Sequence, residues 1–291
     1  MQLKICTVCL LLLATLTTTI SCEQVKKKTP VASKTADSTS FRYDLANPTR
    51  VTLPHALDEI SGISYYPKDT SVFAIVDEDG IFYKINLHGE TTAKSWKFDK
   101  KHDYEDLVRL DSVFYILISN GDIDALRFNG DSISHQKYKA DEGGKKVNEF
   151  ETLYYDDEKK KIIMICKRCE DDKKSEVTAL GFDPASGTFT GEVFKINVKD
   201  IDQKLNKEKI ELKPSAAAIN PITNELYIIS SVSKLLVITD RNGNFKDAYE
   251  LDPAKFNQPE GISFTPDGTM LISNELGDKE NATILIFKYR R

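Results

Sequence analysis

Three glutamates and two serines occupy the same place in a motif that occurs five times in the chain. Glu260 lies in the hexapeptide PEGISF, and weaker copies of this motif begin at residues 60, 104, 150 and 214. The positions equivalent to Glu260 are Ser61, Glu105, Glu151 and Ser215. Carboxylate and hydroxyl oxygens are ligands of the kind that Ca²⁺ takes from proteins. If the fold brings the five positions together, they would form a calcium site.

The repulsion among the glutamates favours a bound cation. Two carboxylates 4 Å apart repel each other by about 4 kcal/mol at an effective dielectric constant of 20. A divalent cation between them would offset this repulsion. The alternative is a wide, water-filled space in which the carboxylates are solvated or partly protonated.

The spacing of the motif indicates the elements that carry these residues. Successive copies are 44, 46, 64 and 45 residues apart, and short β-branched and aromatic runs separated by turn residues fill the intervals. A four-strand unit of about 45 residues is typical of a β-propeller blade. The sequence therefore predicts an all-β, five-bladed β-propeller in which the motif strands line the central channel. Six blades are the alternative, if the 64-residue interval hides a degenerate blade.

The last repeat is one strand short, because the chain ends after TILIFKYRR. The segment FRYDLANPTRVTLP, residues 41–54, could supply the missing outer strand and so remove an open sheet edge. We therefore expect residues 41–291 to form one propeller domain whose ring is closed by an N-terminal strand. The long interval also contains an insertion, residues 198–213, in which Ile201, Leu205 and Ile210 would share one face of a short helix. We expect this insertion to be a solvated flap; a partner site is the alternative.

Several of these segments carry a family resemblance. EISGISY, FAIVDEDG, PSAAAIN, QPEGISFTPDG and LISNE resemble the SdiA-regulated family of bacterial envelope proteins, over roughly residues 50–290. The resemblance implies a five-bladed propeller, similar to NHL-repeat propellers, and an associated calcium ion. It implies no particular reaction.

A second set of polar residues follows the strands after the motif strands. Such residues would cluster near one rim of the channel, where they would bind a polar ligand or form tight turns. They are Asp77, Glu78, Asn120, Lys167, Arg168, Ser231, Asn274 and Glu275.

Cys166 and Cys169 form a CxxC pair at the end of a predicted strand. Zinc would need a second pair of ligands, and no Cys or His pair at such a spacing is present. A thioredoxin-type CxxC opens a helix instead. We expect a local disulfide, with free thiols and redox catalysis as alternatives.

The N-terminus predicts export and lipid anchoring. Residues 1–21 combine Lys4 with an apolar run too short to span a membrane, which is typical of a signal peptide. Ser21 followed by Cys22 resembles a lipoprotein lipobox, so we expect a lipid on Cys22 and a flexible tether over residues 22–40. This would anchor the protein in the bacterial envelope, facing the periplasm or at the outer membrane. The alternative is an ordinary secretory signal with Cys22 incidental.

Composition and motifs narrow the function. The net charge of −5 gives no indication of nucleic-acid binding. No Gly-x-Ser-x-Gly, Walker A or HExxH motif occurs, so no nucleophile–base pair can be assigned. We expect a binding module whose rim takes an unknown protein or small-molecule ligand. The alternative is a calcium-dependent hydrolase, either a phytase-like phosphoesterase or a lactonase.

Overall fold

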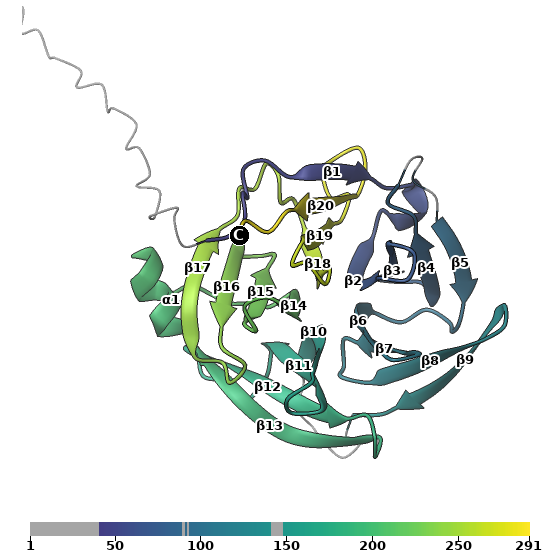
Figure 1. Ribbon diagram of the computed structural model, residues 1–291. Coiled ribbons are helices and arrows are strands. Elements are labelled where there is room, and N and C mark those ends of the chain that lie inside the picture. Colours follow the sequence, from purple (N-terminus) through teal and green to yellow (C-terminus); the bar gives the residue numbers. More distant parts are fainter. Residues whose placement is uncertain (1–40, 89–90, 92, 141–147) are drawn as a thin grey trace, which may run out of the picture. The chain divides into compact units, whose positions relative to one another are not determined.

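The computed structural model describes residues 41–88, 91, 93–140 and 148–291. Within the compact unit Arg42–Arg291, five four-stranded antiparallel sheets are arranged around a central axis (Figure 1). The signal peptide, Cys22 and the tether of residues 22–40 lie outside the described residues.

Each sheet is a blade. From the axis outward, the blades consist of β2 (Ile60–Tyr66), β3 (Ser71–Val76), β4 (Ile81–Ile85) and β5 (Ala93–Lys97); β6 (Tyr104–Leu110), β7 (Val113–Ile118), β8 (Ile123–Asn129) and β9 (Ser132–Tyr138); β10 (Glu149–Asp156), β11 (Lys161–Arg168), β12 (Glu176–Asp183) and β13 (Thr188–Asn197); β14 (Ala216–Ile219), β15 (Leu226–Ser230), β16 (Leu235–Thr239) and β17 (Phe245–Glu250); and β18 (Pro259–Phe264), β19 (Met270–Asn274), β20 (Thr283–Phe287) and β1 (Thr49–Thr52).

The innermost strands close the ring. β2 contacts β6, β6 contacts β10, β10 contacts β14, β14 contacts β18, and β18 contacts β2. The predicted five-bladed propeller is therefore confirmed. The six-bladed alternative is wrong, because the long interval contains one sheet followed by an insertion.

Apolar packing between neighbouring blades forms the core. The second strands are buried along their whole length, as in SVFAIV of β3 and VFYILI of β7, because both faces of each are covered by adjacent sheets. Between the first two blades, the ring of Phe73 lies 4.5 Å from that of Phe114 and 5.0 Å from that of Phe82. Outer strands such as β9 are mostly exposed.

Polar side chains join the inner strands of different blades. The buried carboxylate of Asp106 accepts hydrogen bonds from the backbone N–H of Leu107, 2.8 Å away, and of Leu153 in the next blade, 2.7 Å away. A Cβ atom at Gly62 would lie 2.3 Å from the Asp106 carboxylate, so only glycine fits there. Ser273 Oγ donates to the carbonyl of Ser61 in the same way, at 2.9 Å.

The N-terminal segment completes the last blade, as predicted. β1 pairs antiparallel with β20, with Thr49 opposite Ile286 and Thr52 opposite Thr283. Upstream of β1, the buried ring of Tyr43 packs on Tyr227, and its hydroxyl donates to the carbonyl of Gly268 at 2.7 Å. The closure therefore ties the N-terminal segment to the last two blades.

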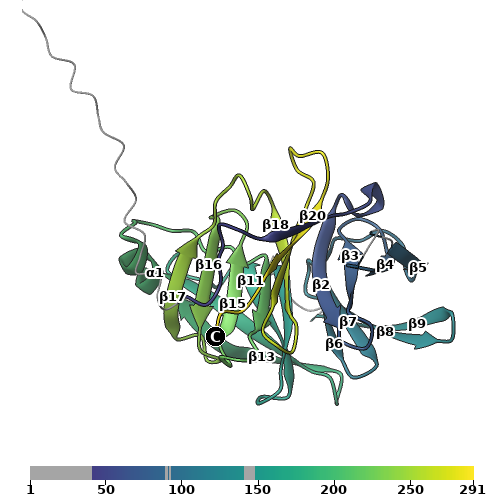
Figure 2. The ribbon, with the colours of Figure 1, turned by 45° about the horizontal axis from the view of Figure 1, so that its top comes forward.

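The insertion after β13 forms a helix, α1 (Val198–Leu205), which contacts β17 (Figures 1 and 2). Ile201 is fully buried, and Leu205 and Ile210 pack against the same apolar cluster. The expectation of a solvated flap is therefore wrong, because this apolar face covers the core of the third and fourth blades. No helix in the described part of the chain is long and apolar enough to cross a membrane.

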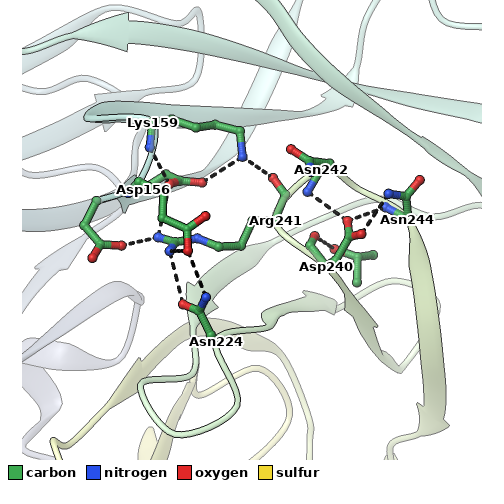
Figure 3. Close-up of polar contacts among 10 residues, drawn as sticks. Asp156, Lys159, Asn224, Asp240, Arg241, Asn242 and Asn244 are labelled. Atoms are coloured by element: carbon green, nitrogen blue, oxygen red, sulfur yellow. Dashed lines mark hydrogen bonds and ion pairs between the residues drawn. The ribbon is translucent and has the colours of Figure 1, made fainter.

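A polar cluster joins the same two blades at the turns after β10 and β16 (Figure 3). The buried guanidinium of Arg241 lies 3.1 Å from the fully buried carboxylate of Asp156 and 2.7 Å from Glu158. Lys159 Nζ donates to the carbonyl of Arg241 at 2.6 Å. These contacts pair a charged group that would otherwise be costly to bury.

Candidate functional site: an acidic channel mouth

β-Bulges set the direction of the motif residues. Glu105 is an extra residue between Tyr104 and Asp106, which face consecutive residues of β7. Glu151 in β10 and Glu260 in β18 are extra residues in the same way. Ser61 also lies in a bulge, between Ile60 and Ile63 of β2. Bulges re-aim side chains and often occur beside functional sites.

These bulged residues share one cavity. It has a volume of about 600 Å³ and lies at the end of the channel where the inner strands begin. Its lining residues are Glu59, Ser61, Asp77, Asp103, Glu105, Glu149, Glu151, Lys167, Ser231, Val232, Lys234, Gln258, Glu260 and Glu275. We call this cavity the acidic mouth, since eight carboxylates and two ammonium groups line it.

Some expected residues lie elsewhere. Ser215 is buried, and its Oγ donates to the carbonyl of Pro259 at 2.8 Å, so it joins two blades outside the cavity lining. Asn120 caps its own turn by accepting from the N–H of Asp122 at 2.9 Å. Asn274 is buried beside the channel, and neither of its side-chain polar atoms has a hydrogen-bond partner among the described residues.

Two more rim residues form ion pairs. Glu78 pairs with Lys101 at 2.8 Å, and Arg168 pairs with Glu149 at 3.2 Å. Neither Glu78 nor Arg168 is among the residues that line the acidic mouth.

Three further carboxylates of the mouth were not expected from the motif. Glu59, Asp103 and Glu149 each lie two residues before a motif position, on the strand side that alternation predicts. Reading each motif copy two residues upstream would have found them.

Burial and mutual repulsion raise the proton affinity of the mouth. Burial raises the pKa of Glu105 to about 8, and the neighbouring Asp77 and Glu260 add to this effect. Burial also raises the pKa of Glu260 to about 7, although a hydrogen bond with Ser231 opposes the shift. The pKa of Glu275 is raised to about 8 by burial and by Glu260. The positive charge available in the mouth is therefore insufficient to keep all its carboxylates ionised at neutral pH.

The two lysines have different partners. Lys167 contacts Glu151 and lies 3.1 Å from Glu149, so it acts as an internal counter-ion. Lys234 donates instead to the carbonyls of Ser231 and Asn257, each at 2.6 Å, and burial lowers its pKa.

The mouth is wide. Among the described residues, two groups of metal-type ligands have their atoms within 4.8 Å of one another, and neither includes a glutamate of the mouth. Its carboxylates would therefore suit a cation that keeps some water ligands, as Ca²⁺ does.

A disulfide lies beside Lys167. The sulfur atoms of Cys166 and Cys169 are bonded, with their Cα atoms 5.7 Å apart. Cys166 is buried, and the bond closes a tight loop that contains Lys167 and Arg168.

The opposite end of the channel has another character. A cavity of about 450 Å³ is lined there by residues of all five inner strands, many of them apolar or aromatic, such as Tyr65, Leu153, Ile219 and Phe264. Oxygen ligands for a cation therefore concentrate at the acidic mouth.

Fold and site together define a five-bladed β-propeller with an acidic channel mouth. The sequence profile of the SdiA-regulated family matches residues 36–276, so the chain belongs to that family. No curated protein matches the sequence.

Solved structures share the fold at low sequence identity. The glutaminyl cyclase of Myxococcus xanthus superposes with a TM-score of 0.55 and 14% identity, over 84% of this chain and 97% of the cyclase chain. A luciferin-regenerating enzyme gives a TM-score of 0.49 and 11% identity, over 83% and 95% of the two chains. At such identity the similarity shows the fold alone.

Proposed function

We propose that the protein is a lipid-anchored binding module of the bacterial envelope whose acidic mouth holds a Ca²⁺ ion. The observation that carries this proposal is the imbalance of charge in the mouth, where eight carboxylates face two ammonium groups. The ion would neutralise part of this charge and offer open coordination positions to oxygen atoms of a ligand.

Glu105 and Glu260 are the best candidates to hold the ion. Both lie at bulges, and both have a pKa raised towards neutrality, which indicates an unmet need for positive charge. Glu151 would join them after partial release from Lys167. Carboxylates are hard oxygen donors, so this set fits calcium better than a softer metal.

A binding role is favoured over catalysis by the residues that line the mouth. The hydroxyls of Ser61 and Ser231 are the potential nucleophiles there, and no histidine lines the same cavity. An activated serine requires an adjacent base to accept its proton.

Calorimetric titration of the chelator-treated protein with CaCl₂ tests the ion. We expect Glu260→Gln to weaken binding at least about tenfold, since one charge–ligand contact is lost. Glu192→Gln, on the exposed outer strand β13, is the matched control and should bind as the wild type does. Equal affinities in all three proteins would overturn the proposed site.

The same proteins test the hydrolytic alternative. Phosphomonoesters and lactones would be supplied with calcium, and product formation would be followed. Turnover that requires calcium and disappears in Glu260→Gln would replace the binding role with a catalytic one.

The anchor rests on the sequence around Cys22 and is tested separately. Mass spectrometry of the membrane fraction should find a chain that begins at Cys22 and carries lipid. A Cys22→Ser protein that still partitions with membranes would contradict the anchor without affecting the calcium site.

A further inference from the structure

A second cluster of metal-type ligands lies between the first two blades, among residues that do not line the acidic mouth. Asp99 and His102 belong to the connection from β5 to β6, and Asp124 is near the start of β8. His135 and Lys137 lie on the outer strand β9. We call these five residues the inter-blade cluster.

Asp124 is the unusual member of this cluster. Its side chain is fully buried, yet neither carboxylate oxygen has a hydrogen-bond partner. Its nearest charged neighbours are Lys137 Nζ at 3.6 Å and His135 Nδ1 at 3.8 Å, both beyond hydrogen-bond distance. A buried carboxylate normally receives several hydrogen bonds or binds a metal.

The ammonium of Lys137 marks the point where the other side chains converge. Lys137 Nζ lies 3.1 Å from Asp99 Oδ2 and 3.3 Å from His102 Nε2, in addition to its contact with Asp124. Two oxygen ligands and an imidazole nitrogen therefore already surround a positive charge at this point. Lys137 is itself partly exposed, so its long side chain can move into solvent.

The spacing of the ligand atoms suits a transition metal. The candidate ligand atoms of Asp99, Asp124 and His135 lie within 4.8 Å of one another, and His102 Nε2 lies 3.8 Å from Asp99 Oδ2. In a tetrahedral zinc site with bonds of about 2.1 Å, ligand atoms are roughly 3.4 Å apart. The exposed side of the cluster carries the two histidines, so side-chain rotation can supply the small contraction required.

We propose that Asp99, His102, Asp124 and His135 form a Zn²⁺ site in which the metal replaces the ammonium of Lys137. Two imidazoles and two carboxylates are a ligand set that favours zinc over calcium. The site is independent of the acidic mouth, because the two share no residue.

The test is a calorimetric titration of the full chain with ZnCl₂ in excess CaCl₂, so that sites built from oxygen alone are occupied. We expect one zinc per chain. His135→Ala, which changes a partly exposed residue, and Asp124→Asn should each weaken binding at least about tenfold. His88→Ala, an exposed histidine outside the cluster, is the matched control and should leave zinc binding unchanged.

Lys137→Met gives a result that a purely structural cluster would not produce. Removal of the competing ammonium should tighten zinc binding by about tenfold. The proposal is overturned if zinc does not bind, if His135→Ala binds as tightly as wild type, or if Lys137→Met weakens binding. Thermal melting of each variant without zinc identifies any that fail to fold; His135→Ala and Lys137→Met then decide the outcome.

Discussion

Glu151 and Lys167 face each other across two adjoining strands, and each is an extra residue in its own strand. Glu151 interrupts the register of β10 between Phe150 and Thr152, while Lys167 interrupts that of β11 between Cys166 and Arg168. Their charged groups contact each other inside the acidic mouth. The protein therefore carries an internal cation at the place where we propose a metal ion binds.

Removal of this internal cation should strengthen calcium binding. We expect Lys167→Met to bind Ca²⁺ about tenfold more tightly, because the mouth loses a charge that competes with the ion. Without calcium, the same variant should be less stable, since Glu149 and Glu151 lose their partner. Titration calorimetry measures the affinity, and Lys173→Met, an exposed lysine outside the mouth, is the control. Weaker binding in Lys167→Met would mean that the lysine helps to hold the ion.

The pH dependence of stability should follow the raised pKa values of the mouth. Glu105 has a native pKa of about 8 against a usual value of 4.5, so the folded protein keeps a proton that the unfolded chain loses. In chelator, the free energy of unfolding should therefore fall as the pH rises from about 5 to 8. After allowance for solvent screening, the expected contribution of Glu105 is on the order of 1–2 kcal/mol.

Urea unfolding at several pH values measures this effect. Glu105→Gln should show a smaller fall, and Glu192→Gln should behave as the wild type. Stability that is flat or rises over this range, equally in wild type and Glu105→Gln, would contradict the raised pKa.

Arg241 should be a large contributor to stability without any role in the mouth. Arg241→Met leaves the buried carboxylate of Asp156 without its guanidinium partner, and such a loss costs about 3–5 kcal/mol. Arg241→Lys should cost less, because it retains the charge but not the second contact. Urea unfolding checks both variants. A loss below about 1 kcal/mol in Arg241→Met would show that water or Lys159 replaces the lost partner.

The N-terminal strand should be required for a monomeric ring. A chain that begins after residue 53 lacks both β1 and Tyr43, which exposes the edge of β20. We expect aggregation, because an unpaired edge strand is a template for association. Size-exclusion chromatography compares this chain with one that begins at residue 41, which should remain monomeric. Two equally soluble and stable monomers would contradict closure by β1.

The fold could be predicted because its signals are local and repeated. Each motif copy begins an inner strand, and the buried second strands appear as apolar runs such as VFYILI. The missing outer strand predicted that residues near Thr49 pair with the C-terminal blade, as β1 does. The helical face formed by Ile201 and Leu205 was also visible, but its burial depended on which blades lay beneath it.

The site was less predictable, because the direction of a side chain at a bulge depends on strand register. Glu105 and Ser215 occupy equivalent motif positions, but Ser215 lies before the start of β14 and bonds to the neighbouring blade. The contact of Lys167 with Glu151 depends on a second bulge, for which the sequence offers no repeated signal.

An anomalous difference map from a crystal grown with CaCl₂ tests the calcium site most directly. The proposed function predicts a calcium peak in the acidic mouth, with carboxylate oxygens of Glu105 and Glu260 about 2.3–2.6 Å from it. A crystal of Glu260→Gln grown in the same way should lose the peak or show it weakened. A wild-type map with no peak in the mouth, and with Lys167 still seated between Glu149 and Glu151, would contradict the proposal.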